Sequence, residues 1–69
     1  MNRSPVVSGN LASVGYDAKT QTLEIEFKDR SIYQYFGVPP TVHAELLAAQ
    51  SVGSYLARNV KGIYRFAKL

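Results

Sequence analysis

A run of strict alternation from Thr22 to Lys28 constrains the fold more than any other part of this chain. Every second residue is apolar, at Leu23, Ile25 and Phe27, and the residues between them are polar or charged. This period of two is typical of a β-strand with one face on a core and one face in water. The sequence therefore predicts a strand here whose apolar residues face the core.

Two further segments predict strands on either side of this run. Before it, the residues alternate from Asn10 to Tyr16, and a polar turn follows at 17–20. After it, Asp29 and Arg30 predict a tight turn, and residues 31–36 have high strand propensity. We therefore expect a three-stranded antiparallel meander.

The residues after the third strand predict a helix. Proline cannot donate to a β-ladder, and its fixed φ suits the first turn of a helix. Residues 37–40 therefore end the sheet, and a helix is expected to begin near Pro40. Val42 and Leu46 lie four residues apart, which gives this helix an apolar face.

A second short helix is expected after an interruption at 51–53. Leu56 and Val60 repeat the four-residue apolar spacing, and Gly62 is a natural C-terminal stop. We therefore expect a single α+β domain in residues 10–69, with two short helices covering one face of the meander.

The two ends of the chain are less constrained by pattern. Residues 1–9 have no stable period and predict a flexible lead-in, although Val6 and Val7 could pair at a sheet edge. Residues 63–69 alternate like a strand but are terminal and basic, so they predict either a strand or an extended tail.

Composition excludes several classes of protein. The chain has 69 residues, of which 46% are hydrophobic and 19% charged, so it is large enough for one folded domain and unlike a disordered chain. With no cysteine and one histidine it can form neither a disulfide nor a zinc site. No apolar run approaches the ~20 residues of a membrane span, and no signal-peptide core is present. We expect a cytoplasmic protein with no metal or other cofactor.

The residues offer no pattern for catalysis. His43 is the only imidazole, and no carboxylate lies at a spacing that would orient it. Asp17 and Asp29 belong to predicted turns, and Glu24 and Glu26 are expected on the water face of their strand as solvated charges. The glycines are scattered singly, which excludes a phosphate-binding loop. We therefore expect a non-enzymatic protein with no catalytic residue.

Tyr33 and Tyr35 share one face of the third predicted strand, and the hairpin register decides which face that is. A two-residue loop would place both rings beside carboxylates on the water face, where paired rings could stack on nucleobases. A bulged loop would pair Ile25 with Tyr33 and turn both rings to the core, but it requires a positive φ at Arg30. We favour the bulged register because it supplies aromatic bulk to a small core, and the sequence leaves both open.

The positive charge is concentrated at the C-terminal end. The net charge is +3, residues 1–50 hold five acidic and four basic residues, and residues 51–69 hold four basic residues and no acidic one. Basic residues interleaved with aromatic ones are typical of surfaces that bind single-stranded RNA. The candidate RNA-binding residues are Arg58, Lys61, Arg65, Lys68, Tyr55 and Tyr64. The same cations could instead only keep the domain soluble, and Tyr64 and Phe66 could pack the tail back onto the domain.

Several blocks of the chain resemble the KTSC domain. They are Val14-Gly15-Tyr16-Asp17, Leu23-Glu24-Ile25-Glu26-Phe27, Tyr33-Gln34-Tyr35 followed by Val38-Pro39, and Ser51-Val52-Gly53-Ser54-Tyr55. This family takes its name from the C-terminal extension of some lysyl-tRNA synthetases, and it includes free-standing small bacterial proteins with a central Tyr-x-Tyr motif. The resemblance implies a domain of unknown function for which RNA binding is proposed by association with the synthetases. Tyr33 and Tyr35 correspond to the signature pair, and Arg30 stands where the family pattern often has Gly.

Two hypotheses for the function follow from the sequence. The first is a non-enzymatic RNA-binding module that uses the basic C-terminal third and its tyrosines. The second is a protein-interaction module or a homo-oligomer, which exposed strand edges and the alternating C-terminal segment would support. Salt-dependent binding to RNA would distinguish the first from the second.

Overall fold

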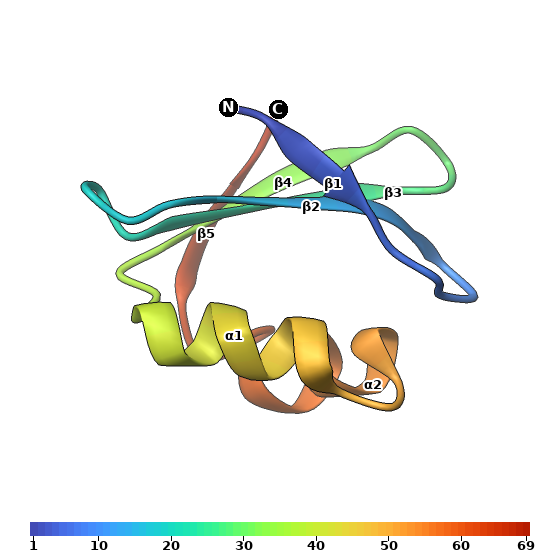
Figure 1. The fold of residues 1–69 in the computed structure, drawn as a ribbon. Coiled ribbons are helices and arrows are strands. Elements are labelled where there is room, and N and C mark those ends of the chain that lie inside the picture. The colour runs from blue at the N-terminus through green and yellow to red at the C-terminus, as the bar shows by residue number, and fades with distance from the viewer.

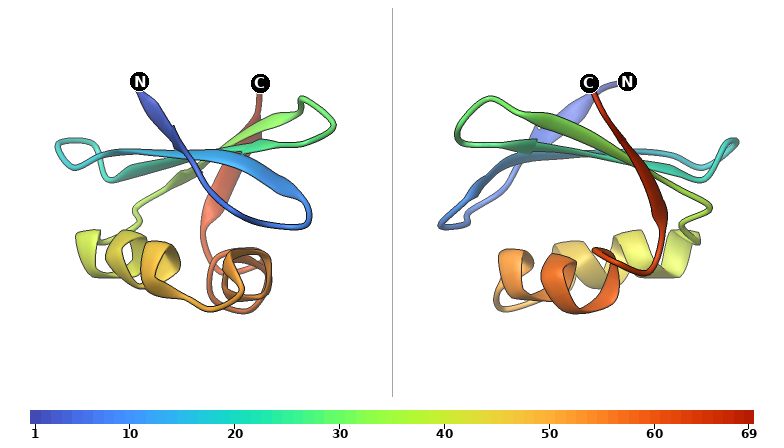
Figure 2. Two further views of the ribbon diagram at one scale, coloured as in Figure 1. Left: turned by 45° about the vertical axis from the view of Figure 1, so that its right-hand side comes forward. Right: turned by 180° about the vertical axis from the view of Figure 1, so that it is seen from behind.

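The computed structural model describes all of residues 1–69 and has two layers, a five-stranded antiparallel sheet and a pair of helices on one of its faces (Figure 1). The strand order follows the chain, and both termini lie on the side of the sheet away from the helices (Figure 2). The elements are β1 (Arg3–Pro5), β2 (Leu11–Asp17), β3 (Thr22–Phe27), β4 (Ile32–Phe36), α1 (Pro40–Ala48), α2 (Val52–Asn59) and β5 (Arg65–Lys68). The α+β class and the two helices on one face are confirmed.

The predicted number of strands is wrong, because each edge of the meander gains a short strand. β1 lies within residues 1–9, expected as a flexible lead-in, and it pairs with β2 through Arg3 opposite Gly15. A Cβ on Gly15 would lie 2.8 Å from the backbone oxygen of Asn2, so the close approach of β1 depends on glycine. β5 forms from the segment predicted as strand or tail, and it pairs with β4. A strand of three residues such as β1 is too short to show a period of its own, and the alternation of residues 63–69 did not distinguish a paired strand from a tail.

The β3–β4 hairpin has the bulged register. Ile25 pairs with Tyr33, the backbone N–H of Phe27 donates to the carbonyl of Ser31 at 2.9 Å, and Arg30 adopts the left-handed φ of 74°. Both tyrosines therefore lie on the face of the sheet that the helices cover. The register that we favoured from the sequence is confirmed, at the expense of an unfavourable backbone conformation at Arg30.

The core lies between this face of the sheet and the two helices. Leu23 and Ile25 are fully buried, as the alternation predicted, and Phe27 at the end of the same strand is half-buried. The other residues without solvent exposure are Leu11, Val38, Leu46, Leu56 and Val60. α1 begins at Pro40, and α2 is capped by Ser51.

The outer face of the sheet is less solvated than the sequence indicated. Glu24 was expected to be a solvated charge but is only 5% exposed, because Arg3 of β1 crosses above it and forms an ion pair with it. Gln34 Nε2 also donates to Glu24 Oε1 at 2.8 Å. Burial raises the pKa of the Glu24 carboxyl, but the hydrogen bonds from Gln34 and Arg3 and the charge of Arg3 outweigh it, so the pKa lies below its usual value.

Candidate functional site

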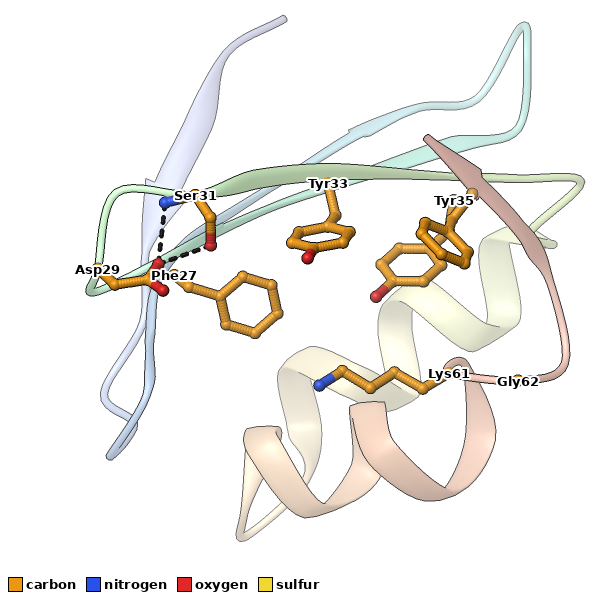
Figure 3. Close-up of a pocket in the computed structure, with 8 residues that line it drawn as sticks. Phe27, Asp29, Ser31, Tyr33, Tyr35, Lys61 and Gly62 are labelled. Carbon is orange, nitrogen blue, oxygen red and sulfur yellow. Dashed lines mark hydrogen bonds between the residues drawn. The ribbon is translucent and has the colours of Figure 1, made fainter. Parts of the chain in front are cut away.

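A groove opens on the helix side of the sheet, between β4 and the residues that follow α2 (Figure 3). Its volume is about 370 Å³, which lies within the ~300–1,000 Å³ of small-ligand sites. Its wall is largely aromatic, and one side is bounded by the turn between β3 and β4. The lining residues are Phe27, Asp29, Ser31, Tyr33, Tyr35, Lys61, Gly62 and Phe66.

Four aromatic rings form a continuous row along this groove, which we call the aromatic row: Phe27, Tyr33, Tyr35 and Phe66. Strand alternation places them on one face, and the β4–β5 register sets Phe66 opposite Tyr35. Tyr33 is at the centre, with its ring centroid 5.5 Å from that of Phe27 and 5.8 Å from that of Phe66. Tyr35 is buried and Phe66 is 59% exposed, so the row runs from the core to the surface.

The hydroxyl groups of Tyr33 and Tyr35 have no hydrogen-bond partner in the protein. By contrast, the hydroxyls of Tyr16 and Tyr55 donate to the carbonyl of Val38 and to Glu45. No buried side-chain polar atom is left unpaired, so solvent reaches the hydroxyl of Tyr35 although most of its ring is buried. Burial raises the pKa of Tyr35, and Tyr33 adds to the effect. Both hydroxyls point into the groove in Figure 3, where they can bind a polar ligand.

Two lysines approach the aromatic row from different elements. Lys61, just after α2, has its Nζ 5.2 Å from the ring centroid of Phe27, and Lys68 on β5 has its Nζ 5.8 Å from that of Tyr33. Both side chains are exposed, and such distances allow cation–π attraction. The groove therefore combines partly exposed aromatic rings with two nearby positive charges.

Of the six candidate RNA-binding residues, only Lys61 lines this groove, and Lys68 lies beside it with its Nζ near the ring of Tyr33. Arg58 is exposed on α2 but does not line the groove, and Arg65 points to the outer face of β5, opposite Phe36 in the register. The remaining two, Tyr55 and Tyr64, pack partly against the core, and the Tyr55 hydroxyl donates to Glu45 at 2.7 Å to join the two helices.

The sequence did not identify Phe27 and Phe66 as members of a site. Phe27 was expected to face the core, and Phe66 either to pack the tail onto the domain or to contact a protein partner. The missing information was the pairing of β5 with β4, which sets Phe66 and Lys68 beside Tyr35 and Tyr33. The one available signal was the alternation of residues 63–69.

Asp29 closes the end of the groove next to Phe27 (Figure 3). Its Oδ1 accepts hydrogen bonds from the backbone N–H of Ser31 at 2.9 Å and from the Ser31 hydroxyl at 2.6 Å. These bonds lower the pKa of Asp29, with the hydroxyl making the largest contribution. At neutral pH the groove therefore ends in a carboxylate of fixed orientation.

The other titratable groups do not assemble a second site. His43 stacks on Tyr16 with ring centroids 4.6 Å apart, and burial lowers the pKa of this histidine. No cluster of three or more His, Cys, Asp or Glu side chains is arranged to hold a metal ion. None of the helices is both long enough and apolar enough to cross a membrane.

Comparison with known proteins agrees with the resemblance seen in the sequence. A family model described as the KTSC domain matches residues 7–64. The chain belongs to the KTSC domain family. The crystal structure of a KTSC domain protein from Yersinia pestis superposes with a TM-score of 0.96 at 37% identity, covering 99% of this chain and 96% of that one.

Relatives of this KTSC domain occur in chains of very different length. A lysine–tRNA ligase of Nostoc punctiforme is 46% identical over 54 residues, which are 78% of this chain and 10% of the ligase. A protein of Tsukamurella paurometabola is 38% identical over 65 residues, which are 94% of this chain and 97% of that protein. The KTSC domain thus spans about a tenth of the ligase and nearly the whole of the small protein.

Proposed function

We propose that this domain is a non-enzymatic module that binds single-stranded RNA in the groove of the aromatic row. The observation that carries the proposal is the position of Lys61 and Lys68, each with its Nζ within 6 Å of a ring centroid of the row. Nucleobases stack on aromatic rings, at ~1–3 kcal/mol per base, while lysines neutralise the phosphates between them. The groove offers both kinds of contact side by side.

The chemistry of the groove favours a single strand over a duplex. Bases in a duplex are stacked on one another, so their faces cannot reach Tyr33 or Phe66. The free hydroxyls of Tyr33 and Tyr35 match the 2′-hydroxyl of ribose, which donates and accepts hydrogen bonds and distinguishes RNA from DNA. The similarity to lysine–tRNA ligases also supports RNA as the ligand, because the name of these relatives includes tRNA.

Titration of the protein with a fluorescent oligouridine at several salt concentrations tests the proposal. The logarithm of the binding constant should fall linearly with the logarithm of salt concentration, by ~0.7 per phosphate neutralised on a single strand. Lys61→Gln and Lys68→Gln should each reduce that slope by about this amount. Arg65→Gln is the matched control, because Arg65 lies on the same strand as Lys68 but on the opposite face of the sheet.

Absence of binding at low salt would overturn the proposal. The competing function is a protein-interaction or self-associating module, which the unpaired outer edges of β1 and β5 favour. In that case a partner protein would stay bound at high salt, and a proline at an outward N–H of β5 would abolish binding. Arg65 and Lys68 on β5 oppose pairing of this edge with a second copy, because like charges would be brought together.

A further inference from the structure

The carboxylate of Asp29 is the one negative group that lines the groove of a proposed RNA-binding site. We infer that Asp29 makes the groove prefer guanine, by accepting hydrogen bonds from the Watson–Crick edge of a base stacked on the aromatic row. This inference rests on the RNA-binding function proposed above, and it adds base preference to that site.

Asp29 has one oxygen held by the protein and one free. Its Oδ1 accepts both hydrogen bonds from Ser31, and no protein group donates to Oδ2. A carboxylate oxygen has two lone-pair positions, so Oδ2 can accept two further donors. Because Ser31 fixes the carboxylate, little orientational freedom is lost when a ligand binds.

The neighbouring groups determine which part of a nucleotide meets this oxygen. A phosphate is repelled by the carboxylate of Asp29 and attracted to the exposed Lys61 and Lys68, whereas an N–H donor of a base is attracted to the carboxylate. Phe27 lies between Asp29 and Tyr33 in Figure 3. The rings of Phe27 and Tyr33 are nearly perpendicular, so a base stacks on only one of them. A base on the ring of Phe27, which lies next to Asp29, can present its edge to this carboxylate.

Guanine has the edge that best fits a carboxylate. Its N1–H and N2–H₂ donors are adjacent, so both can reach Oδ2. Adenine and cytosine each place a ring-nitrogen acceptor next to their exocyclic amine, and uracil has two carbonyl oxygens beside its N3–H. With these three bases an acceptor of the base would face an acceptor of the protein, which is unfavourable.

The test compares uridine nonamers that carry one central guanosine, inosine or adenosine, each titrated into the intact protein. A bidentate base contact gives ~1–3 kcal/mol of discrimination, so the guanosine oligomer should bind at least about fivefold tighter than the adenosine oligomer. Inosine lacks the N2 amino group, so it should lose most of this advantage. This ligand substitution leaves the protein unchanged and does not depend on any variant folding.

Asp29→Asn is the matched protein variant, because its amide oxygen can still accept from Ser31 while its second group is a donor. It should remove the preference for guanosine and leave the affinity for all-uridine RNA equal or higher. Equal binding of all three oligomers, or a guanosine preference that persists in Asp29→Asn, would overturn the inference and leave the proposed function intact. Failure of every oligomer to bind would contradict the proposed function itself.

Discussion

Phe66 of β5 lies directly opposite Tyr35 of β4, with ring centroids 6.0 Å apart, yet one side chain is 59% exposed and the other 3%. This pair marks the point at which the aromatic row leaves the core and becomes a surface. Burial separates their roles, because Tyr35 supports the fold while Phe66 presents a ring face to solvent.

Alanine at each position of this pair should separate stability from binding. Tyr35→Ala should cost about 3–5 kcal/mol, the range for deleting a buried aromatic ring; a domain of this size has about that much stability, so the variant should lose its cooperative urea transition. Phe66→Ala should cost less than half as much, because its ring is already exposed, and should weaken RNA binding at least about fivefold. Urea titration followed by fluorescence measures the first effect, and anisotropy with labelled RNA the second. Equal losses of stability would contradict this division of roles.

Ile25→Asp should abolish cooperative unfolding. Ile25 has no solvent exposure, and a carboxylate there would be buried without a partner. A domain of this size has only ~3–5 kcal/mol of stability to lose. Ile63→Asp is the matched control, since Ile63 is 62% exposed and should tolerate the charge. A wild-type thermal melt for Ile25→Asp would show that the core face has been misassigned.

Arg30→Gly should stabilise the protein. The φ of 74° at Arg30 costs a residue with a Cβ ~1–2 kcal/mol, whereas glycine adopts it freely but loses ~0.5–1 kcal/mol through its flexible unfolded chain. The net gain should be up to about 1.5 kcal/mol, seen as a higher urea midpoint. Lys28→Gly is the control, because Lys28 lies two residues earlier and has no positive φ. This variant should lower the urea midpoint. A lower urea midpoint for Arg30→Gly would mean that the positive φ of Arg30 does not strain the turn.

The Arg3–Glu24 ion pair should make the free energy of unfolding depend on pH. The pKa of Glu24 is lower in the folded chain, so its contribution is fully present above the unfolded pKa of about 4.3 and is lost as the pH falls through the folded pKa. Glu24→Gln should cost about 1–3 kcal/mol at pH 7, because Arg3 loses a charged partner.

Urea midpoints measured from pH 7 to pH 2.5 check this expectation. The difference between the wild type and Glu24→Gln should shrink as the pH falls below about 4. Arg3→Gln should show the same convergence, because it removes the other half of the pair. A difference that stays constant with pH would mean that the carboxylate does not titrate as the geometry requires.

Local pattern in the sequence determined the core face of β3, the start of α1 and the family. The alternation of Leu23 and Ile25 identified a core face, because strand side chains change sides at every residue whatever the rest of the chain does. Pro40 marked a helix start for an equally local reason, its fixed φ.

Tertiary structure alone decided which residues form the site. Phe66 and Lys68 join Tyr35 and Tyr33 only because β5 returns to the edge of β4, and Glu24 is buried only because β1 brings Arg3 across it. These pairings join distant parts of the chain, and the packing of the whole domain selects them. No period within β1 or β5 encodes a partner, because a short edge strand takes its register from the sheet on which it docks.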